Sequence, residues 1–330
     1  MTRLLAGRSL NPIGLGCMGL THGYGVPPTA AEAAEVLRKA LDLGYDHLDT
    51  ARLYGEGRNE ELIGRVLKGY RRDFFLASKL GIVIDGPKRR TDCRPETIRA
   101  QVEESLRLLQ TDHIDLYYLH RRDFAVPIED SVGAMAELVQ AGKIGAIGLS
   151  EMSAETLRKA HATHPIAAMQ TEYSPWTRNV EIAVLEATRA LGVALVAFSP
   201  LARGVLAGGM RAPETLLPDD IRYTHPRFQP DNWPTNRALA EAFDAIAAEQ
   251  GVTPAQLSLG WVLSRGEHVH AIPGTTRLDH LAENAARADW RPSPEAVACI
   301  DALINQDTVA GHRYAAAMRR TIDTEDFPES

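Results

Sequence analysis

The chain has 330 residues, of which 45% are hydrophobic and 24% are charged, the composition of an ordinary globular protein that needs no disulfides. Its formal net charge of −7 argues against general nucleic-acid binding, and no apolar run is long enough to span a membrane. The three cysteines form no CxxC pair and the first residues lack the apolar stretch of a signal peptide, so we expect a cytoplasmic protein without a metal site.

Short apolar runs alternate with amphipathic segments along the chain, at a spacing of roughly 30–40 residues. Eight runs are typical of strands and cover 13–17, 46–50, 74–79, 114–120, 144–149, 167–172, 194–199 and 269–273. Helical periodicity covers 29–43, 58–68, 95–109, 129–141, 153–162, 179–191 and 277–287. This alternation predicts an α/β fold, a (β/α)8 TIM barrel in which helices surround eight parallel strands.

Some segments fall outside this alternation: a hairpin over Leu4–Asn11 that plugs the barrel bottom, a proline-rich loop over 205–232, extra helices over 236–249 and 254–264 after the seventh strand, and a C-terminal helix over 294–304. A loop as long as 205–232 usually covers a functional site. We expect a single domain over 1–330, in which the acidic end, 321–330, is a mobile tail.

A glycine pattern after the first predicted strand raises the alternative of a Rossmann domain. The segment Gly14-Leu15-Gly16-Cys17-Met18-Gly19 fits the G-x-G-x-x-G fingerprint of dinucleotide-binding proteins. That fingerprint needs a helix directly after the glycines, so that the helix N-terminus meets the pyrophosphate. Here a loop over 21–28 follows, and helical signals begin only near Thr29. We therefore interpret the glycines as a strand end that turns beside a ligand.

Four reactive side chains stand at or just beyond the ends of neighbouring predicted strands: Asp49, Tyr54, Lys79 and His120. Each alone has an ordinary interpretation, as a loop carboxylate, a half-buried phenol, a solvent-facing lysine or a hydrogen-bonded core histidine. In a parallel barrel, however, the strand C-terminal ends converge on one mouth, where such folds keep their chemistry. Taken together, the four residues predict one catalytic site.

Their chemistry fits the reduction of a carbonyl group. A hydride that reaches a carbonyl carbon leaves negative charge on the oxygen, so a proton donor must be in place. Tyr54 would be a weak acid at its ordinary pKa of about 10, but a lysine cation nearby favours the phenolate and an aspartate keeps that lysine charged. The imidazole of His120 can polarise the carbonyl oxygen by hydrogen bonding.

Several motifs occur in a fixed order along the chain. They are Asp49-Thr50-Ala51-Arg52-Leu53-Tyr54-Gly55, Asn59-Glu60-Glu61-Leu62-Ile63-Gly64, Ser78-Lys79, Tyr118-Leu119-His120, Gly142-Lys143-Ile144, Gly148-Leu149-Ser150, Gln170-Thr171-Glu172-Tyr173-Ser174 and Phe198-Ser199-Pro200-Leu201-Ala202-Arg203-Gly204. This set resembles the aldo-keto reductase family, most closely a bacterial and plant branch that includes perakine-reductase-like and IolS-like enzymes. The resemblance implies a (β/α)8 barrel that binds NADPH in extended form.

The resemblance also implies roles for single residues. Tyr54 is then the acid, Lys79 and Asp49 its tuning pair, and His120 the residue that orients the carbonyl. Cofactor contacts are implied for Cys17, Met18, Asp49, Ser150, Gln170, Phe198, Ser199, Pro200, Leu201, Arg203, Gly204, Gly274, Thr275, Thr276, Arg277, Glu283 and Asn284. In this set Ser150 and Gln170 hydrogen-bond the nicotinamide carboxamide, Phe198 stacks on its ring, and 199–204 line the pyrophosphate.

Two positions bear on how the cofactor binds. Glu151 stands where many relatives carry asparagine, and a carboxylate cannot donate to the carboxamide oxygen, so its direct contact is in doubt. Thr275 or Thr276 has an alternative interpretation as a plain helix N-cap. Arg277 at a helix start opposes the helix dipole unless a phosphate binds there, which favours NADPH or NADP+ over NADH.

The substrate is the least determined part. Family likeness implies Leu20, Tyr24 and Trp176 as pocket residues, although they can equally be packing residues, and we expect a mostly apolar pocket for a small carbonyl substrate. We expect no nucleic-acid or membrane partner, and a homo-oligomer stays possible. Two alternatives to an NADPH-dependent reductase remain: the same chemistry run as an NADP-dependent alcohol dehydrogenase, and a cofactor-binding regulatory subunit with little turnover.

Overall fold

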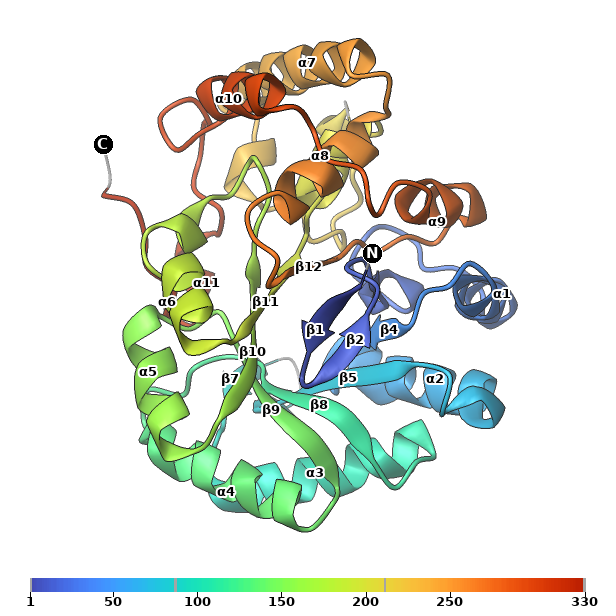
Figure 1. Cartoon of the computed structure of the whole chain (residues 1–330), viewed down its shortest axis with the longest axis vertical. Coiled ribbons are helices and arrows are strands. Elements are labelled where there is room, and N and C mark those ends of the chain that lie inside the picture. The colour runs from blue at the N-terminus through green and yellow to red at the C-terminus, as the bar shows by residue number, and fades with distance from the viewer. Residues whose placement is uncertain (1, 86–87, 211, 329–330) are drawn as a thin grey trace.

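The computed structural model describes residues 2–85, 88–210 and 212–328. Its centre is one sheet of eight parallel strands in the order β3–β4–β5–β8–β9–β10–β11–β12 (Figure 1). Their bounds are Leu15–Gly16, His47–Asp49, Phe75–Leu80, Ile114–Leu119, Ile144–Ser150, Ile166–Glu172, Ala194–Phe198 and Val269–Ile272. A parallel bridge joins Ile13 to Ala271, and the Gly14 N–H donates to the Ala271 carbonyl at 2.9 Å, so the sheet closes into a barrel.

Helices alternate with the strands and surround the barrel (Figure 1). They are α1 Ala30–Asp42, α2 Arg58–Leu67, α3 Pro95–Leu109, α4 Ile128–Gln140, α5 Ala154–Thr163, α6 Val184–Leu191, α8 Pro254–Leu263 and α9 Leu278–Ala285. In α1, Val36, Leu37 and Ala40 recur at helical spacing and are buried, and Thr29 and Glu32 close a capping box at its start. The predicted (β/α)8 barrel is confirmed. In the part of the chain that the structure describes, no helix is long and apolar enough to cross a membrane.

Close packing explains the two glycines in and just before β3, the first strand of the barrel. A Cβ on Gly14 would lie 2.7 Å from the His47 Nδ1 atom, and a Cβ on Gly16 would lie 2.8 Å from the Ile272 carbonyl oxygen. Both distances are too short for real side chains, so β3 fits between its neighbours only with glycine at these positions. A 3-10 turn, η1 (Met18–Leu20), and a loop follow, and α1 begins only at Ala30. A Rossmann fingerprint needs a helix directly after its glycines, so these glycines do not form one.

The predicted hairpin is present and closes one end of the barrel. It consists of β1 (Arg3–Leu5) and β2 (Arg8–Leu10), paired antiparallel. Leu5 and Leu10 are buried with residues that line the barrel interior. The Arg3 guanidinium donates to the Leu263 carbonyl at 2.9 Å, which ties the hairpin to the end of α8. This end of the barrel is therefore sealed by apolar packing.

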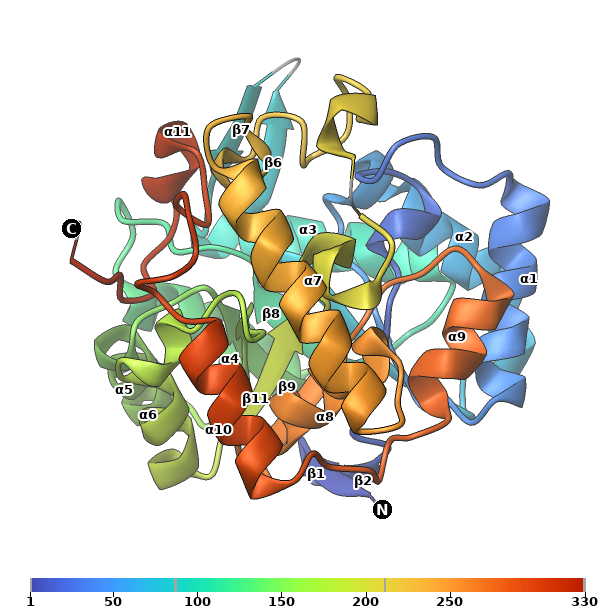
Figure 2. The ribbon, with the colours of Figure 1, turned by 90° about the horizontal axis from the view of Figure 1, so that it is seen from above.

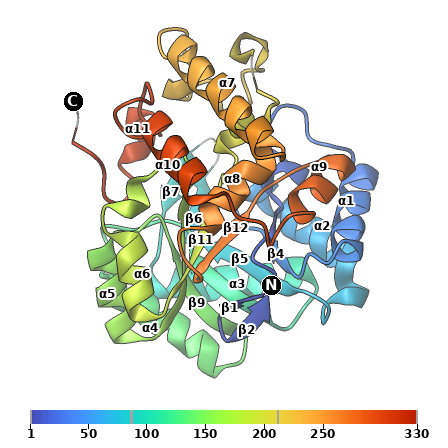
Figure 3. The same cartoon turned by 45° about the horizontal axis from the view of Figure 1, so that its top comes forward.

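The opposite end carries the segments that exceed the regular repeats (Figure 2). A hairpin of β6 (Ile82–Asp85) and β7 (Lys88–Thr91), which the sequence analysis did not predict, follows β5 directly. The expected long loop over 205–232 contains the 3-10 turns η6 (Pro213–Thr215) and η7 (Pro226–Phe228), and a further turn, η5 (Ala202–Ala207), leads into it. Helix α7 (Trp233–Glu249) follows and packs against α10 (Pro294–Leu303) (Figure 3).

The C-terminal segment corrects one expectation. We expected a mobile tail over 321–330, but its described part, 321–328, is bonded to the barrel after a short helix, α11 (Ala316–Arg319). The Asp323 carboxylate accepts from the Ser153 N–H at 2.9 Å, and the Glu325 carboxylate accepts from the Ala154 N–H at 2.9 Å. Two acidic side chains at the start of α5 also favour the helix dipole. The last two residues lie outside the described part.

Candidate active site

Three adjacent strands bring the four predicted reactive side chains to one end of the barrel. Asp49 ends β4, Lys79 is the last residue but one of β5, and His120 follows β8 directly. Tyr54 opens a 3-10 turn, η2 (Tyr54–Gly57), just after β4. Because β4 pairs with β5 and β5 pairs with β8, all four side chains share the mouth opposite the N-terminal hairpin.

Lys79 is the centre of this group and is fully buried. Its ammonium donates to the Asp49 carboxylate, to the Thr50 carbonyl at 2.8 Å and to the Tyr54 hydroxyl at 3.2 Å. The three ammonium protons thus have three partners. Burial alone would lower the pKa of Lys79, but the charges of Asp49 and Tyr54 raise it above its ordinary value, so the side chain stays cationic at neutral pH.

Tyr54 lies close to two imidazoles. Its ring centroid is 5.9 Å from that of His120 and 5.5 Å from that of His22. Burial raises the pKa of the Tyr54 phenol, and the Lys79 cation opposes that rise without cancelling it. The expectation that Lys79 makes Tyr54 a stronger acid than free tyrosine is therefore corrected. The phenol stays protonated at neutral pH, and the lysine limits the cost of forming the phenolate.

His120 is 6% exposed and is held in the neutral form. Burial lowers the pKa of its imidazole well below the ordinary value, and the charges of Arg121, Lys79 and Arg89 lower it further. A neutral imidazole keeps one N–H that can donate to a carbonyl oxygen. The backbone N–H of His120 donates to the Leu80 carbonyl at 2.9 Å, which fixes the residue beside β5.

Polar side chains from β9 and β10 complete the group. The Gln170 amide donates to the second Asp49 oxygen at 2.7 Å, so Gln170 offers an incoming carboxamide mainly its carbonyl oxygen. The Ser150 hydroxyl accepts from the Arg121 guanidinium at 3.3 Å, which leaves its own proton free to donate. Both side chains are almost fully buried. This donor and acceptor pair suits a carboxamide such as that of a nicotinamide.

Comparisons with known proteins identify the family of this chain. The model of the aldo/keto reductase family matches residues 12–305. This chain belongs to the aldo/keto reductase family. It is 41% identical to aldo-keto reductase str7 of Strobilurus tenacellus, over 99% of each chain. The structure of a glycerol dehydrogenase from Gluconobacter oxydans has a TM-score of 0.85 at 28% identity, covering 100% of this chain and 98% of the other. An aldo/keto reductase from Klebsiella pneumoniae, in complex with NADP and acetate, has a TM-score of 0.73 at 27% identity, covering 95% and 98%.

The residues expected to contact the nicotinamide and the pyrophosphate differ in solvent exposure. Phe198 is half-buried at the end of β11, whereas Cys17 is fully buried and its N–H donates to the Asp49 carbonyl at 2.8 Å. Met18 and Leu201 are half-buried, and Pro200 is buried. Left-handed backbone occurs at Ser199, Ala202, Arg203 and Gly204, a conformation that is costly for the three non-glycine residues and is often found near active sites.

The charge of Arg203 in this loop is already balanced by a carboxylate. Its guanidinium forms an ion pair with Glu172 at 2.9 Å, and both side chains are nearly buried. It therefore offers less to a pyrophosphate than a free arginine would.

The expected adenosine end is the start of α9. Arg277 immediately precedes this helix, rather than lying in its first turn, and its exposed guanidinium pairs with Asp279, with Nε 3.0 Å from Oδ1. The Thr275 hydroxyl accepts from the Arg277 N–H at 3.1 Å, but the N-cap position is Arg277 and no side chain caps the helix, so the alternative interpretation of Thr275 or Thr276 as the N-cap is wrong. Asn284 is 2% exposed, and its side-chain oxygen has no hydrogen-bond partner among the described residues. Such an orphaned acceptor fits a ligand with amino donors. Gly274 and Glu283 stand beside these residues in the chain.

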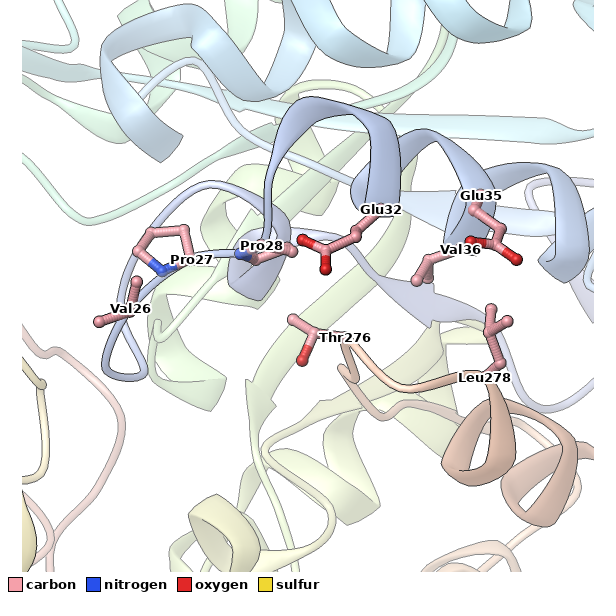
Figure 4. Close-up of a pocket in the computed structure, with 8 residues that line it drawn as sticks. All are labelled: Val26, Pro27, Pro28, Glu32, Glu35, Val36, Thr276 and Leu278. Atoms are coloured by element: carbon pink, nitrogen blue, oxygen red, sulfur yellow. The ribbon is translucent and has the colours of Figure 1, made fainter.

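A surface pocket of about 410 Å³ lies beside this end and not over Tyr54. It opens between the start of α1 and the residues that precede α9, and its wall includes Thr276, Glu32 and Glu35 (Figure 4). Two carboxylates in its wall disfavour a phosphate in the pocket itself. Any 2′-phosphate is therefore better placed on the Arg277 side.

The three expected substrate residues separate into two kinds. Leu20 and Trp176 are 2% and 4% exposed within the main core, so in this structure they pack and offer little surface to a ligand. Trp176 stacks edge-on against Phe228. Tyr24 is half-buried beneath the Arg222 guanidinium, 5.0 Å from its ring, and keeps some accessible surface.

Sequence reasoning missed the role of Glu151. Its carboxylate forms a two-pronged ion pair with Arg313, at 3.1 and 3.0 Å, and accepts from the Thr324 hydroxyl at 2.9 Å. Both charged side chains are buried. Glu151 thus anchors the C-terminal segment instead of reaching a carboxamide. No sequence pattern links residues 162 positions apart, so no signal could have found this pair.

Proposed function

We propose that this chain reduces aldehydes and ketones to alcohols with NADPH, with Tyr54 as the general acid. The observation that carries the proposal is the Tyr54 hydroxyl, 3.2 Å from a buried Lys79 that Asp49 holds in place, beside a neutral His120. When bound, NADPH supplies the hydride. The side chains then need only to orient the carbonyl and deliver a proton.

Different side chains orient the carbonyl, deliver the proton and bind the cofactor. The His120 N–H donates to the carbonyl oxygen and stabilises the negative charge that develops there. Tyr54 gives its proton to that oxygen, and the Lys79 cation stabilises the phenolate that remains. Ser150 and Gln170 suit the carboxamide of the cofactor, and Arg277 suits the 2′-phosphate that distinguishes NADPH from NADH.

The test follows NADPH absorbance with the purified protein and a panel of aromatic and aliphatic aldehydes, with NADH in parallel. We expect turnover with NADPH and weaker turnover with NADH. Absence of turnover with both cofactors on every carbonyl would refute the proposal, and a preference for NADH would refute its cofactor part alone.

Oxidation of alcohols is a second candidate, because a structural neighbour is described as a glycerol dehydrogenase. The same residues serve the reverse reaction, with the Tyr54 phenolate accepting the proton of the alcohol. The two directions are compared with glycerol and benzyl alcohol plus NADP+. A kcat/KM for any alcohol above that for its own aldehyde at neutral pH would favour this second function.

A further inference from the structure

The mouth around Tyr54 carries three arginines that are not neutralised. Arg121 directly follows His120, Arg89 lies on the β6–β7 hairpin, and Arg58 opens α2. Within the described residues, none of them forms an ion pair with a carboxylate, unlike Arg203 and Arg313 deeper in the barrel end. A cation with no fixed counter-ion is available to an anionic ligand.

Arg121 is the best placed of the three. Its side chain is half-buried and folds back over the strand ends, where Nη1 donates to the His120 carbonyl at 2.6 Å and to the Ser150 hydroxyl at 3.3 Å. Both acceptors are neutral, so the charge remains. An arginine has five N–H donors in a planar fork, and in the described part of the chain only those on Nη1 bond to protein. The second edge of the fork is free.

The other charged groups near the reacting atoms do not cancel this field. Asp49 is already paired with Lys79 and bonded to Gln170. Asp123 is 8% exposed and accepts from the backbone N–H groups of Cys93 and Ala125. Burial first, and then the charges of Arg89 and Arg58, lower the pKa of His22, as Arg121 and Arg89 do for His120. Positive charges thus act on both imidazoles beside Tyr54.

We propose that the enzyme prefers carbonyl substrates that carry an anionic group such as a carboxylate, and that Arg121 is the residue that recognises this group. The inference rests on the proposed function and departs from the mostly apolar pocket expected from the sequence. A carboxylate gains a charge-assisted, two-pronged contact with the free edge of the Arg121 fork. Arg89 and Arg58, both exposed, draw such substrates to the mouth at long range.

The test compares 4-carboxybenzaldehyde with its methyl ester, methyl 4-formylbenzoate, using NADPH and the complete chain. The ester is the more electrophilic aldehyde, so a preference for the carboxylate cannot come from intrinsic reactivity. A second pair, succinic semialdehyde and methyl 4-oxobutanoate, repeats the comparison without the ring. In wild type we expect kcat/KM to favour each carboxylate by about tenfold or more, mainly through a lower KM.

Substitutions then assign the preference to a residue. Arg121→Gln should lower the carboxylate-to-ester ratio by about tenfold, whereas Arg121→Lys, which keeps the charge, should retain most of it. Arg89→Gln, on an exposed hairpin, should lower the ratio by about twofold, because it acts only through long-range charge. The matched control is Arg99→Gln on α3, which removes an exposed arginine paired with Glu137 and should leave the ratio unchanged. Added salt should reduce the wild-type ratio.

The outcomes separate the two proposals. Reduction of the esters without any preference for the carboxylates, or an equal ratio in wild type and Arg121→Gln, would overturn the role of Arg121 and leave the reductase function intact. If Arg121→Gln fails to fold, the effects of Arg89→Gln and of salt decide, since a ratio insensitive to both contradicts the inference. Failure to reduce all four compounds with either cofactor would refute the proposed function and this inference with it.

Discussion

Tyr54 is the residue on which the proposed chemistry depends most directly. Its hydroxyl lies within hydrogen-bond distance of Lys79, and its ring is close to those of His22 and His120. Tyr54→Phe removes the transferable proton and keeps the ring, so we expect kcat to fall by about 10²-fold or more with little change in NADPH affinity. Steady-state kinetics and a fluorescence titration of NADPH measure the two effects. Retention of more than about a tenth of wild-type kcat would exclude Tyr54 as the acid.

Lys79 acts through Tyr54 and is tested by the pH profile as well as by the rate. Lys79→Met removes the cation that stabilises the phenolate, so kcat should fall about as far as in Tyr54→Phe and its dependence on pH should change. Breaking a buried pair also costs about 3–5 kcal/mol of stability, because the Asp49 carboxylate is left without its cation. The double variant Asp49→Asn/Lys79→Met separates folding from catalysis. A wild-type profile and rate in either variant would contradict the role of this pair.

Arg277 separates cofactor choice from catalysis. Arg277→Ala should weaken NADPH binding severalfold, through loss of a charge-assisted contact with the phosphate, and leave NADH binding nearly unchanged. Asp279→Asn is the matched control, because it frees the same guanidinium from its neighbour and should not weaken NADPH. Titration of both cofactors in the two variants is the measurement. Equal losses for NADPH and NADH in Arg277→Ala would make Arg277 purely structural.

At the scale of single residues, the sequence predicts the reactive side chains but not their partners. The four reactive residues could be predicted because each ends or follows an apolar run, and parallel strands bring such ends together. The partners that set their charge could not, since Gln170 meets Asp49 across 121 positions and Glu151 meets Arg313 across 162. Leu20 and Trp176 were chosen by family likeness, which does not report whether a side chain faces the mouth or the core.

At the scale of helices and strands, the hydrophobic periodicity of the sequence predicts most of the elements. The eight strands and their helices were predicted within a few residues, because alternating burial leaves a period in the sequence. Helix α7 begins at Trp233, three residues before the predicted 236, and the turn η4 (Asn179–Glu181) interrupts the helix expected over 179–191. The β6–β7 hairpin was missed because its second strand, Lys88–Thr91, is basic and has no apolar run.

The buried ion pair between Glu151 and Arg313 anchors the C-terminal segment, so breaking it should lower the stability of the protein. Glu151→Ala leaves Arg313 buried without its partner, so the free energy of unfolding should fall by about 3–5 kcal/mol. Glu151→Ala/Arg313→Met should recover part of that loss, because no unpaired charge remains. Urea unfolding measures both.

The control is Glu155→Ala, which breaks the exposed pair with Lys159 in α5 and should leave stability nearly unchanged. If Glu151→Ala is no more damaging than this control, then the buried pair does not hold the segment.

At the scale of the whole molecule, the barrel interior contains histidines that cannot accept a proton without cost. Burial, with the Lys79 charge, lowers the pKa of His47 to about 3, and burial with the His47 charge lowers that of His270 to about 3. Both rings are fully buried where the N-terminal hairpin closes the barrel. Neither ring nitrogen of His47 has a hydrogen-bond partner among the described residues.

The sign of the pH effect follows from these directions. In the unfolded chain a histidine has its ordinary pKa of about 6.5. Below that pH the unfolded state therefore binds protons that the native state does not bind. The free energy of unfolding must then fall as the pH falls from about 6.5 toward 3, by about 1.4 kcal/mol per pH unit for each histidine. The molecule should be most stable near neutral pH and should lose its barrel core on mild acidification.

A variant isolates this contribution from that of the carboxyl groups. His47→Leu removes one titrating group from the barrel interior, so its urea-unfolding free energy should depend on pH less steeply than that of wild type between about pH 6 and 4, by about 1.4 kcal/mol per unit. His280→Gln, at an exposed position of α9, should keep the wild-type slope. Equal slopes in wild type and His47→Leu would mean that His47 takes up its proton in the folded barrel. In that case the sealed end must admit water, and the packing of Leu5 and Leu10 would not be what excludes it.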